Sequence, residues 1–245
     1  AAAITTRAQR DGDEYLITGQ KVFTTNAHVA NYLIASAKTD PNAGHRGISL
    51  FVVPTDACGV DIRPMDPIGR RTSLPNEVYL DEVRVPAGYR LGAENEGWKK
   101  LMYGLNLERV LLAAAASGQC IKLIELARAW AKERRTFGQP ITEYQAISHK
   151  FADMAMLTET ARLHTYDVAD LLDLGENPIC ETAMAKTIAT ENNIKVADLG
   201  LQIMGGAGYM RGDLSRLWLD ARQGSIGAGT SEIMRNIIAR HVLEP

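Results

Sequence analysis

One proline-free stretch decides the fold of the second half of the chain. Residues 97–135 read GWKKLMYGLNLERVLLAAAASGQCIKLIELARAWAKERR. A helix of this length would run for about ten turns, and no residue inside the stretch forces it to stop. Leu101, Leu105 and Leu112 recur on one face, which is the spacing of a helix packed against a core. We therefore predict a long helix that belongs to a helical bundle.

Further helical segments follow this stretch with short connections between them. The pattern predicts one helix over about 145–173, one from Pro178 to Met204, and a short one from about Thr230 to His241. Proline is well suited to the first turn of a helix, where its missing N–H costs nothing. Long antiparallel helices with short connections are typical of a bundle. Residues 93–245 are thus expected to form an antiparallel four-helix bundle.

Upstream of this region the period of the hydrophobic pattern changes. Short apolar or β-branched runs occupy residues 15–17, 32–35, 48–53 and 77–80, separated by turn signals rich in Gly, Pro, Asp and Asn. No helical pattern lies between these runs, so an antiparallel β-barrel or sandwich is favoured over βαβ units. We expect an α+β multidomain protein with a β-domain over residues 1–92.

Composition narrows the range of possible partners. The 245 residues include 27 Lys+Arg and 29 Asp+Glu, for a net charge of −2, and 46% are hydrophobic. Such a chain is globular, and its charge argues against nucleic acid as the main partner. The longest apolar run, residues 110–116, is too short to span a bilayer, so no membrane is expected. Three widely spaced cysteines predict neither a disulfide framework nor a metal site, and they suit a reducing compartment.

Glu108 lies on the apolar face of the predicted long helix. Ionised carboxylates are rarely buried without partners, because desolvation is costly or raises the pKa. Glu108 could turn outward or pair with a cation from another helix, as most such residues do. It could instead be a general base tuned by burial. The spacing alone does not choose between these interpretations.

Three glycine-containing motifs can each be explained by the structure of a helix end. The GGAG run at 205–208 follows a helix rather than a strand, so it fails as a dinucleotide-binding loop and reads better as a helix C-cap. The GAGTSE run at 227–232 is either a helix N-cap or a binding site for an oxygen-rich ligand at a helix N-terminus. The RRTFG run at 134–138 could be a solvated basic helix end.

Several segments together resemble one protein family over essentially the whole chain. They occur in order and with the expected spacing: TGQKVFTTNA at 18–27, EVYLDEVRVP at 77–86, ERRTFGQP at 133–140, YQA at 144–146, QIMGGAGY at 202–209 and GTSEI at 229–233. In these segments the chain resembles the acyl-CoA dehydrogenase family. The resemblance implies a middle β-domain followed by a C-terminal helical domain. It also implies that an N-terminal helical domain of the family is absent from this chain.

The family resemblance further implies a bound FAD, with residues carried over position by position. Phe23, Thr24 and Thr25 match the strand against the flavin ring, where Phe23 replaces the tryptophan of many relatives. Arg134, Thr136, Phe137 and Gln145 match residues that reach the FAD of a neighbouring subunit. Gln202, Gly205 and Gly206 match the adenosine-contacting loop, and Thr230 and Glu232 match FAD contacts at the start of the last helix.

The position of the catalytic base separates this chain from most of its family. Most relatives have a glutamate where Ala228 stands, whereas the isovaleryl-CoA dehydrogenase-like branch has it on the long helix, at the position of Glu108. The resemblance therefore implies that Glu108 is the base, in a site that excludes water and raises its pKa. Asn106, Arg109, Gly227, Ala228 and Gly229 are the expected substrate-binding residues.

The implied reaction is α,β-desaturation of an acyl-CoA thioester, possible for branched chains because residues 227 and 228 are small. Electrons would pass to an electron-transfer flavoprotein, and the protein would form a homotetramer or homodimer. It would be cytoplasmic in a bacterium and in the mitochondrial matrix of a eukaryote. A flavin monooxygenase or desulfinase of the same fold, or a non-catalytic scaffold, are the alternatives.

Overall fold

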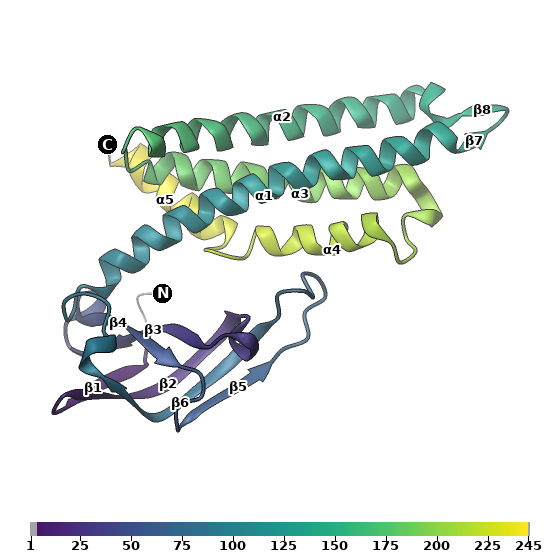
Figure 1. Cartoon of the computed structure of the whole chain (residues 1–245). Coiled ribbons are helices and arrows are strands. Elements are labelled where there is room, and N and C mark those ends of the chain that lie inside the picture. Colours follow the sequence, from purple (N-terminus) through teal and green to yellow (C-terminus); the bar gives the residue numbers. More distant parts are fainter. Residues whose placement is uncertain (1–3, 245) are drawn as a thin grey trace. The chain divides into compact units, whose positions relative to one another are not determined.

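The computed structural model describes residues 4–244, and the chain divides into two compact units, Ala1–Gly104 and Leu105–Pro245 (Figure 1). The first unit is built on a sheet and the second on helices, which confirms the α+β class. The expected functional boundary at residues 92/93 stays a prediction.

A single curled sheet of six strands forms the first unit, in the order β4-β3-β1-β2-β6-β5. One neighbouring pair departs from the expected antiparallel pattern, because β1 and β3 run parallel. The sheet is therefore mixed: four of its five neighbouring strand pairs are antiparallel, as predicted, and the β1–β3 pair is parallel. The strands are β1 (Arg7–Asp11), β2 (Glu14–Thr25), β3 (Tyr32–Lys38), β4 (Ile48–Pro54), β5 (Val60–Pro64) and β6 (Pro75–Pro86).

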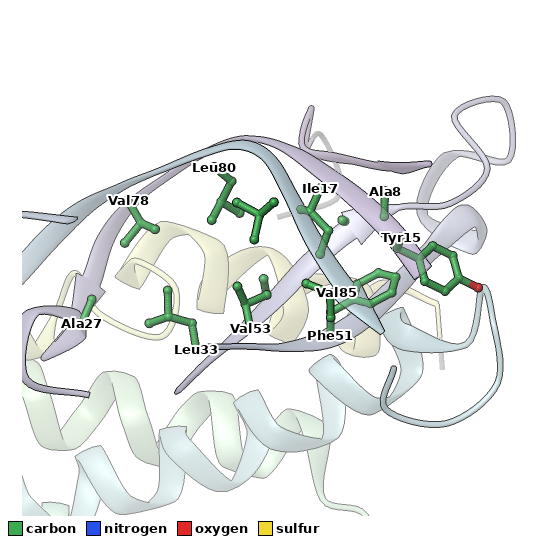
Figure 2. Packing of buried hydrophobic residues seen from close by; sticks show 13 residues of the cluster. Ala8, Tyr15, Ile17, Ala27, Leu33, Phe51, Val53, Val78, Leu80 and Val85 are labelled. Carbon is green, nitrogen blue, oxygen red and sulfur yellow. The ribbon is translucent and has the colours of Figure 1, made fainter. Parts of the chain in front are cut away.

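The concave side of this sheet holds the core of the first unit (Figure 2). Tyr15 and Phe51 are fully buried in it, with their ring centroids 4.9 Å apart and tilted by 59°. An irregularity in the pairing of β2 with β6 lies beside Glu82, whose φ is +49°. It shifts the alternation by one residue, so that Leu80 and Val83 both face the core.

Within the described residues, five α-helices make up the helical part: α1 (Gly97–Glu133), α2 (Gln145–Asp173), α3 (Ile179–Met204), α4 (Asp213–Gly224) and α5 (Ser231–Leu243). The sequence predicted four of them and missed α4, which follows a glycine-rich segment. Its signal was present nonetheless, because Leu214, Leu217 and Ala221 recur at helical spacing and pack into the core. Leu123, Ala127, Met154 and Val196 lie in the same cluster.

A small hairpin separates α1 from α2 and projects from one end of the bundle (Figure 1). Its strands are β7 (Arg135–Thr136) and β8 (Gln139–Pro140), with Thr136 paired to Gln139. Phe137 and Gly138 form the two-residue turn, with φ values of +48° and +91°. Positive φ at both positions is the pattern of a type I′ hairpin turn. Hence the 134–138 run is a hairpin, not a solvated helix end.

Five short 3₁₀ helices connect the main elements: Ala27–Val29, Gly44–Gly47, Ala87–Tyr89, Ile141–Glu143 and Gly205–Ala207.

Helix α1 is long and apolar enough to cross a membrane by length and composition alone. A single helix of this kind is weak evidence, since long helices in bundles of soluble proteins pass the same test. The expectation that no membrane is involved stays a prediction.

Candidate active site

The third to fourth turns of α1 bring Asn106, Glu108 and Arg109 together. Arg109 is only 6% exposed, and its Nη1 donates a hydrogen bond to Asn106 Oδ1 at 2.8 Å. Its Nε donates to the carbonyl oxygen of Ala228 at 3.1 Å. This second bond joins the helix that carries the predicted base to the turn at residues 227–229.

Glu108 itself is exposed among the residues that the structure describes. The leucines expected to share its face, Leu101, Leu105 and Leu112, are half-buried. The carboxylate lies at the solvent edge of the apolar stripe, which is the outward orientation that the sequence spacing left open. Water exclusion at Glu108 is not provided by the described residues.

The turn at residues 227–229 has an unusual backbone. Ala228 has a φ of +52° and Gly229 a φ of +105°, both in the left-handed half of conformational space. A side chain on Gly229 would also place its Cβ 2.8 Å from the Cε of Met234. Within residues 4–244, the backbone N–H groups of Ala228, Gly229 and Thr230 donate to no protein acceptor. The turn therefore presents free donors next to α1.

A second buried cation contacts the same turn. Lys186 on α3 is fully buried, and its Nζ donates to the carbonyl oxygen of Gly229 at 2.8 Å. Burial, followed by the charge of Arg109, lowers the pKa of Lys186 to about 8. Sequence reasoning missed Lys186, although a lysine amid the apolar residues of a predicted core helix was an available signal.

Thr230 and Glu232 begin α5 directly after this turn. The Thr230 hydroxyl accepts a hydrogen bond from the N–H of Ile233, which confirms the N-cap interpretation. The backbone N–H at the helix start and the Thr230 hydroxyl lower the pKa of Glu232. Both residues thus have local structural roles, and their predicted contact with FAD stays a prediction.

In the first unit, Phe23, Thr24 and Thr25 end strand β2. The pairing of β2 with β6 shifts between Lys21 and Thr24, which marks a bulge. Phe23 lies in this bulge with a φ of +59°, and 70% of its surface is exposed. Bulges re-aim side chains beside functional sites. Phe23 is thereby turned outward from the sheet.

The hairpin presents the second predicted cofactor segment. Phe137 is 97% exposed at its tip. Thr136 is held through its carbonyl, which accepts from Tyr144 Oη at 2.8 Å. Arg134 and Gln145 are exposed at the adjoining ends of α1 and α2. These four residues share one end of the bundle, with the aromatic ring free of packing in the described chain.

Gln202, Gly205 and Gly206 lie at the C-terminal end of α3. Gly205 caps the helix with a φ of +58°, as the C-cap interpretation predicted. A Cβ on Gly205 or Gly206 would meet no described atom within 4 Å. Packing within the described chain therefore does not require glycine at 206, and the space beside both backbones is open.

Three of the residues predicted from sequence to bind cofactor or substrate have a left-handed backbone. Seven non-glycine residues have positive φ among those the structure describes: Phe23, Asn26, Arg70, Glu82, Asn95, Phe137 and Ala228. Three of them, Phe23, Phe137 and Ala228, were named from sequence as site residues. Each such conformation costs energy and persists where surrounding structure enforces it, commonly at functional sites.

The structure also contains a basic and aromatic cavity that sequence analysis did not predict. It measures about 710 Å³ and lies within the first unit. The rings of His45 and Trp98 approach to 5.6 Å. Lys99 and Lys100 occupy the first turn of α1, where the helix dipole disfavours cations. The lining residues are His45, Arg46, Asn95, Glu96, Trp98, Lys99, Lys100 and Tyr103.

Residues 4–244 contain no group of three or more His, Cys, Asp or Glu side chains that could hold a metal ion.

Comparison with known proteins places the chain in a family. Residues 1–83 match the acyl-CoA dehydrogenase middle domain, and residues 95–243 match the acyl-CoA dehydrogenase C-terminal domain. The chain belongs to the acyl-CoA dehydrogenase family.

Individual relatives agree with this assignment. The chain is 41% identical to a probable acyl-CoA dehydrogenase of Bacillus subtilis, over 100% of this chain and 65% of that protein. It is 38% identical to the cyclohexane-1-carbonyl-CoA dehydrogenase of Geobacter metallireducens, over 99% of this chain and 64% of the relative. The structure of butyryl-CoA dehydrogenase from Megasphaera elsdenii superimposes with a TM-score of 0.96 at 32% identity, over 99% of this chain and 64% of that one. The chain thus spans just under two thirds of these relatives.

Proposed function

We propose that this chain carries the catalytic base and much of the cofactor site of an FAD-dependent acyl-CoA dehydrogenase. One observation carries the proposal. The hydrogen bond from Arg109 to the Ala228 carbonyl joins the Glu108 segment of α1 to a turn with free N–H donors. A carboxylate and a set of amide donors in one unit are the two elements that proton abstraction beside a thioester carbonyl requires.

Each of these groups has a definite task in the reaction. Glu108 takes the α-proton of the acyl chain as a general base. The backbone N–H groups of residues 228–230, here called the 228–230 turn, donate to the thioester oxygen, where negative charge develops as the α-proton leaves. FAD, when bound, supplies the acceptor for the hydride that leaves the β-carbon. Arg109 holds the turn of α1 that carries Glu108 in place beside residues 228–230, through its hydrogen bond to the Ala228 carbonyl.

The cofactor segments have features that fit a flavin dinucleotide. Phe23 and Phe137 present aromatic rings to the outside on strained backbones, an arrangement that intramolecular packing does not explain. Arg134 has no ion-pair partner among the described residues and can offer a planar cation to a pyrophosphate. Open space beside Gly205 and Gly206 allows a ligand to approach their backbones closely.

The basic cavity suits the nucleotide end of coenzyme A. Arg46, Lys99 and Lys100 supply positive charge, and the N-terminus of α1 adds its dipole. Trp98 and Tyr103 offer aromatic faces for the adenine. We expect Lys99→Ala/Lys100→Ala to raise the KM for an acyl-CoA about tenfold and to leave the KM for the matching acyl-pantetheine unchanged. An equal rise in KM for the acyl-CoA and for the acyl-pantetheine would show that this cavity does not bind the nucleotide end of coenzyme A.

The substrate is proposed to be a short or branched acyl-CoA, as in the isovaleryl-CoA dehydrogenase-like branch. Gly227 and Ala228 are small, which leaves room beside the reacting carbons. The relative that acts on cyclohexane-1-carbonyl-CoA, a bulky acyl group, is consistent with this. An electron-transfer flavoprotein as acceptor and a homotetramer or homodimer as the assembly complete the proposal.

The test is an anaerobic titration of the FAD-loaded full-length protein with branched and straight acyl-CoAs. We expect loss of the visible absorbance of oxidised flavin, fastest with branched chains, and at least a 10³-fold slower loss in Glu108→Gln. Glu125→Gln is the matched control, because Glu125 is an exposed glutamate on the same helix. Introducing Ala228→Glu into Glu108→Gln should restore part of the rate, since it returns a carboxylate to the position used by most relatives.

Each alternative predicts a different outcome. A flavin monooxygenase or desulfinase would keep its own activity in Glu108→Gln. A non-catalytic scaffold would bind no FAD. Loss of flavin absorbance with straight-chain acyl-CoAs only would refute the proposed branched-chain specificity and leave the proposed dehydrogenase activity intact.

A further inference from the structure

Lys186 occupies a position that is costly for a lysine. It is fully buried in α3, and its one hydrogen bond within residues 4–244 goes to the carbonyl oxygen of Gly229. It forms no salt bridge with a described carboxylate, and Arg109 brings a second positive charge close by. Burying a lysine without an ion-pair partner destabilises the folded state, so packing alone does not explain its presence here.

The two buried cations bind consecutive carbonyls of the same turn. Arg109 Nε holds the oxygen of Ala228 at 3.1 Å, and Lys186 Nζ holds the oxygen of Gly229 at 2.8 Å. In a trans peptide the C=O and the following N–H point in opposite directions. Fixing these two oxygens toward the buried cations therefore fixes the N–H groups of Gly229 and Thr230 to face the other way.

Among residues 4–244, these N–H groups donate to no protein acceptor. A cation bound to a carbonyl also polarises its amide, so the N–H becomes a better donor. We propose that Lys186 is a positioning residue: with Arg109 it holds the 228–230 turn so that its free N–H groups face the thioester oxygen of the substrate. This inference rests on the proposed function and adds a residue to it.

Other contacts already fasten the helices concerned. Arg235 on α5 forms two hydrogen bonds with Glu191 on α3, at 2.7 and 2.9 Å. Thr190 packs against Gly224 at the end of α4. These contacts link α5 and α4 to α3 without Lys186, whose own hydrogen bond goes to the turn.

The experiment uses the FAD-loaded full-length enzyme and a chromophoric, conjugated aryl-acryloyl-CoA as the probe. The absorbance of this thioester shifts to the red when its carbonyl is polarised on binding. We expect Lys186→Met to lose most of the red shift and to slow flavin reduction about 10- to 100-fold, while KM changes less than threefold. Lys186→Arg, which keeps a charged donor, should recover part of both.

Lys195→Met is the matched control, because Lys195 is an exposed lysine on the same helix. A wild-type red shift and reduction rate in Lys186→Met would overturn the inference and leave the proposed function intact. Absence of both signals in the wild type would overturn the proposed function itself, and this inference with it. If Lys186→Met does not fold, Lys186→Gln takes its place, with the same expected loss and the same overturning result.

Discussion

Replacing Gly229 by alanine tests whether the left-handed turn before α5 is as constrained as its geometry indicates. The φ of +105° lies in a region that residues with a Cβ rarely adopt, which costs about 1–3 kcal/mol. The new Cβ would also lie 2.8 Å from Cε of Met234, which is fully buried. Moving that side chain adds about 1 kcal/mol. We expect the free energy of unfolding to fall by about 2–4 kcal/mol in total.

The assay is urea-induced unfolding followed by the circular dichroism of the helices. Gly118→Ala serves as the matched control, because Gly118 lies on the exposed face inside α1 with no atom near its missing Cβ. That change should raise the free energy of unfolding by about 0.5–1 kcal/mol. The two Gly→Ala changes therefore have opposite expected signs. A Gly229→Ala protein as stable as the wild type would refute the claim that the turn is constrained.

Three other predictions follow from the burial of particular side chains. Phe51→Ala removes the ring that packs on Tyr15 and should cost about 3–5 kcal/mol, read as a lower urea midpoint of the sheet unit; a cost under 1 kcal/mol would contradict its place in the core. The pKa of Lys186 is lowered to about 8 from 10.5. Below pH 8 the lysine is charged in both the folded and the unfolded chain, so the folded chain bears the full cost of burying the charge. From pH 8 to 10.5 the folded chain releases the proton first, so the free energy of unfolding should rise by up to about 3 kcal/mol relative to Lys186→Met, and parallel pH profiles would refute this. Iodoacetamide should alkylate exposed Cys58 first and Cys120 last, because burial raises the pKa of Cys120 to about 12; peptide mapping that found the reverse order would contradict the packing of α1.

The sequence was most informative where a pattern repeats. The proline-free run of α1 and the apolar period of α2 and α3 predicted those helices closely, since helical spacing is set by local geometry. Strand runs identified the sheet residues, but strand order depends on pairings between distant segments. The parallel contact between Arg7 and Lys38 had no local signal.

The site residues could likewise be located from the sequence, but their conformation and exposure could not. Family motifs located Phe23, Phe137 and Ala228 in sequence, yet their positive φ values became visible only with the fold. Glu108 shares a stripe with leucines, and the spacing left its orientation open between outward and buried. A stripe has edges, however, and periodicity does not tell whether a residue lies at the centre or at the edge.

The turn that precedes α5 depends on side chains far away in the chain. Arg109 is 119 residues from Ala228, and Lys186 is 43 residues from Gly229. Contacts of such long sequence separation form late, because the intervening chain must be ordered first. During refolding, helix content should therefore return before the turn acquires its left-handed shape. The recovery of catalysis would then lag behind the recovery of secondary structure, and the interval would report how long α1 and α3 take to dock.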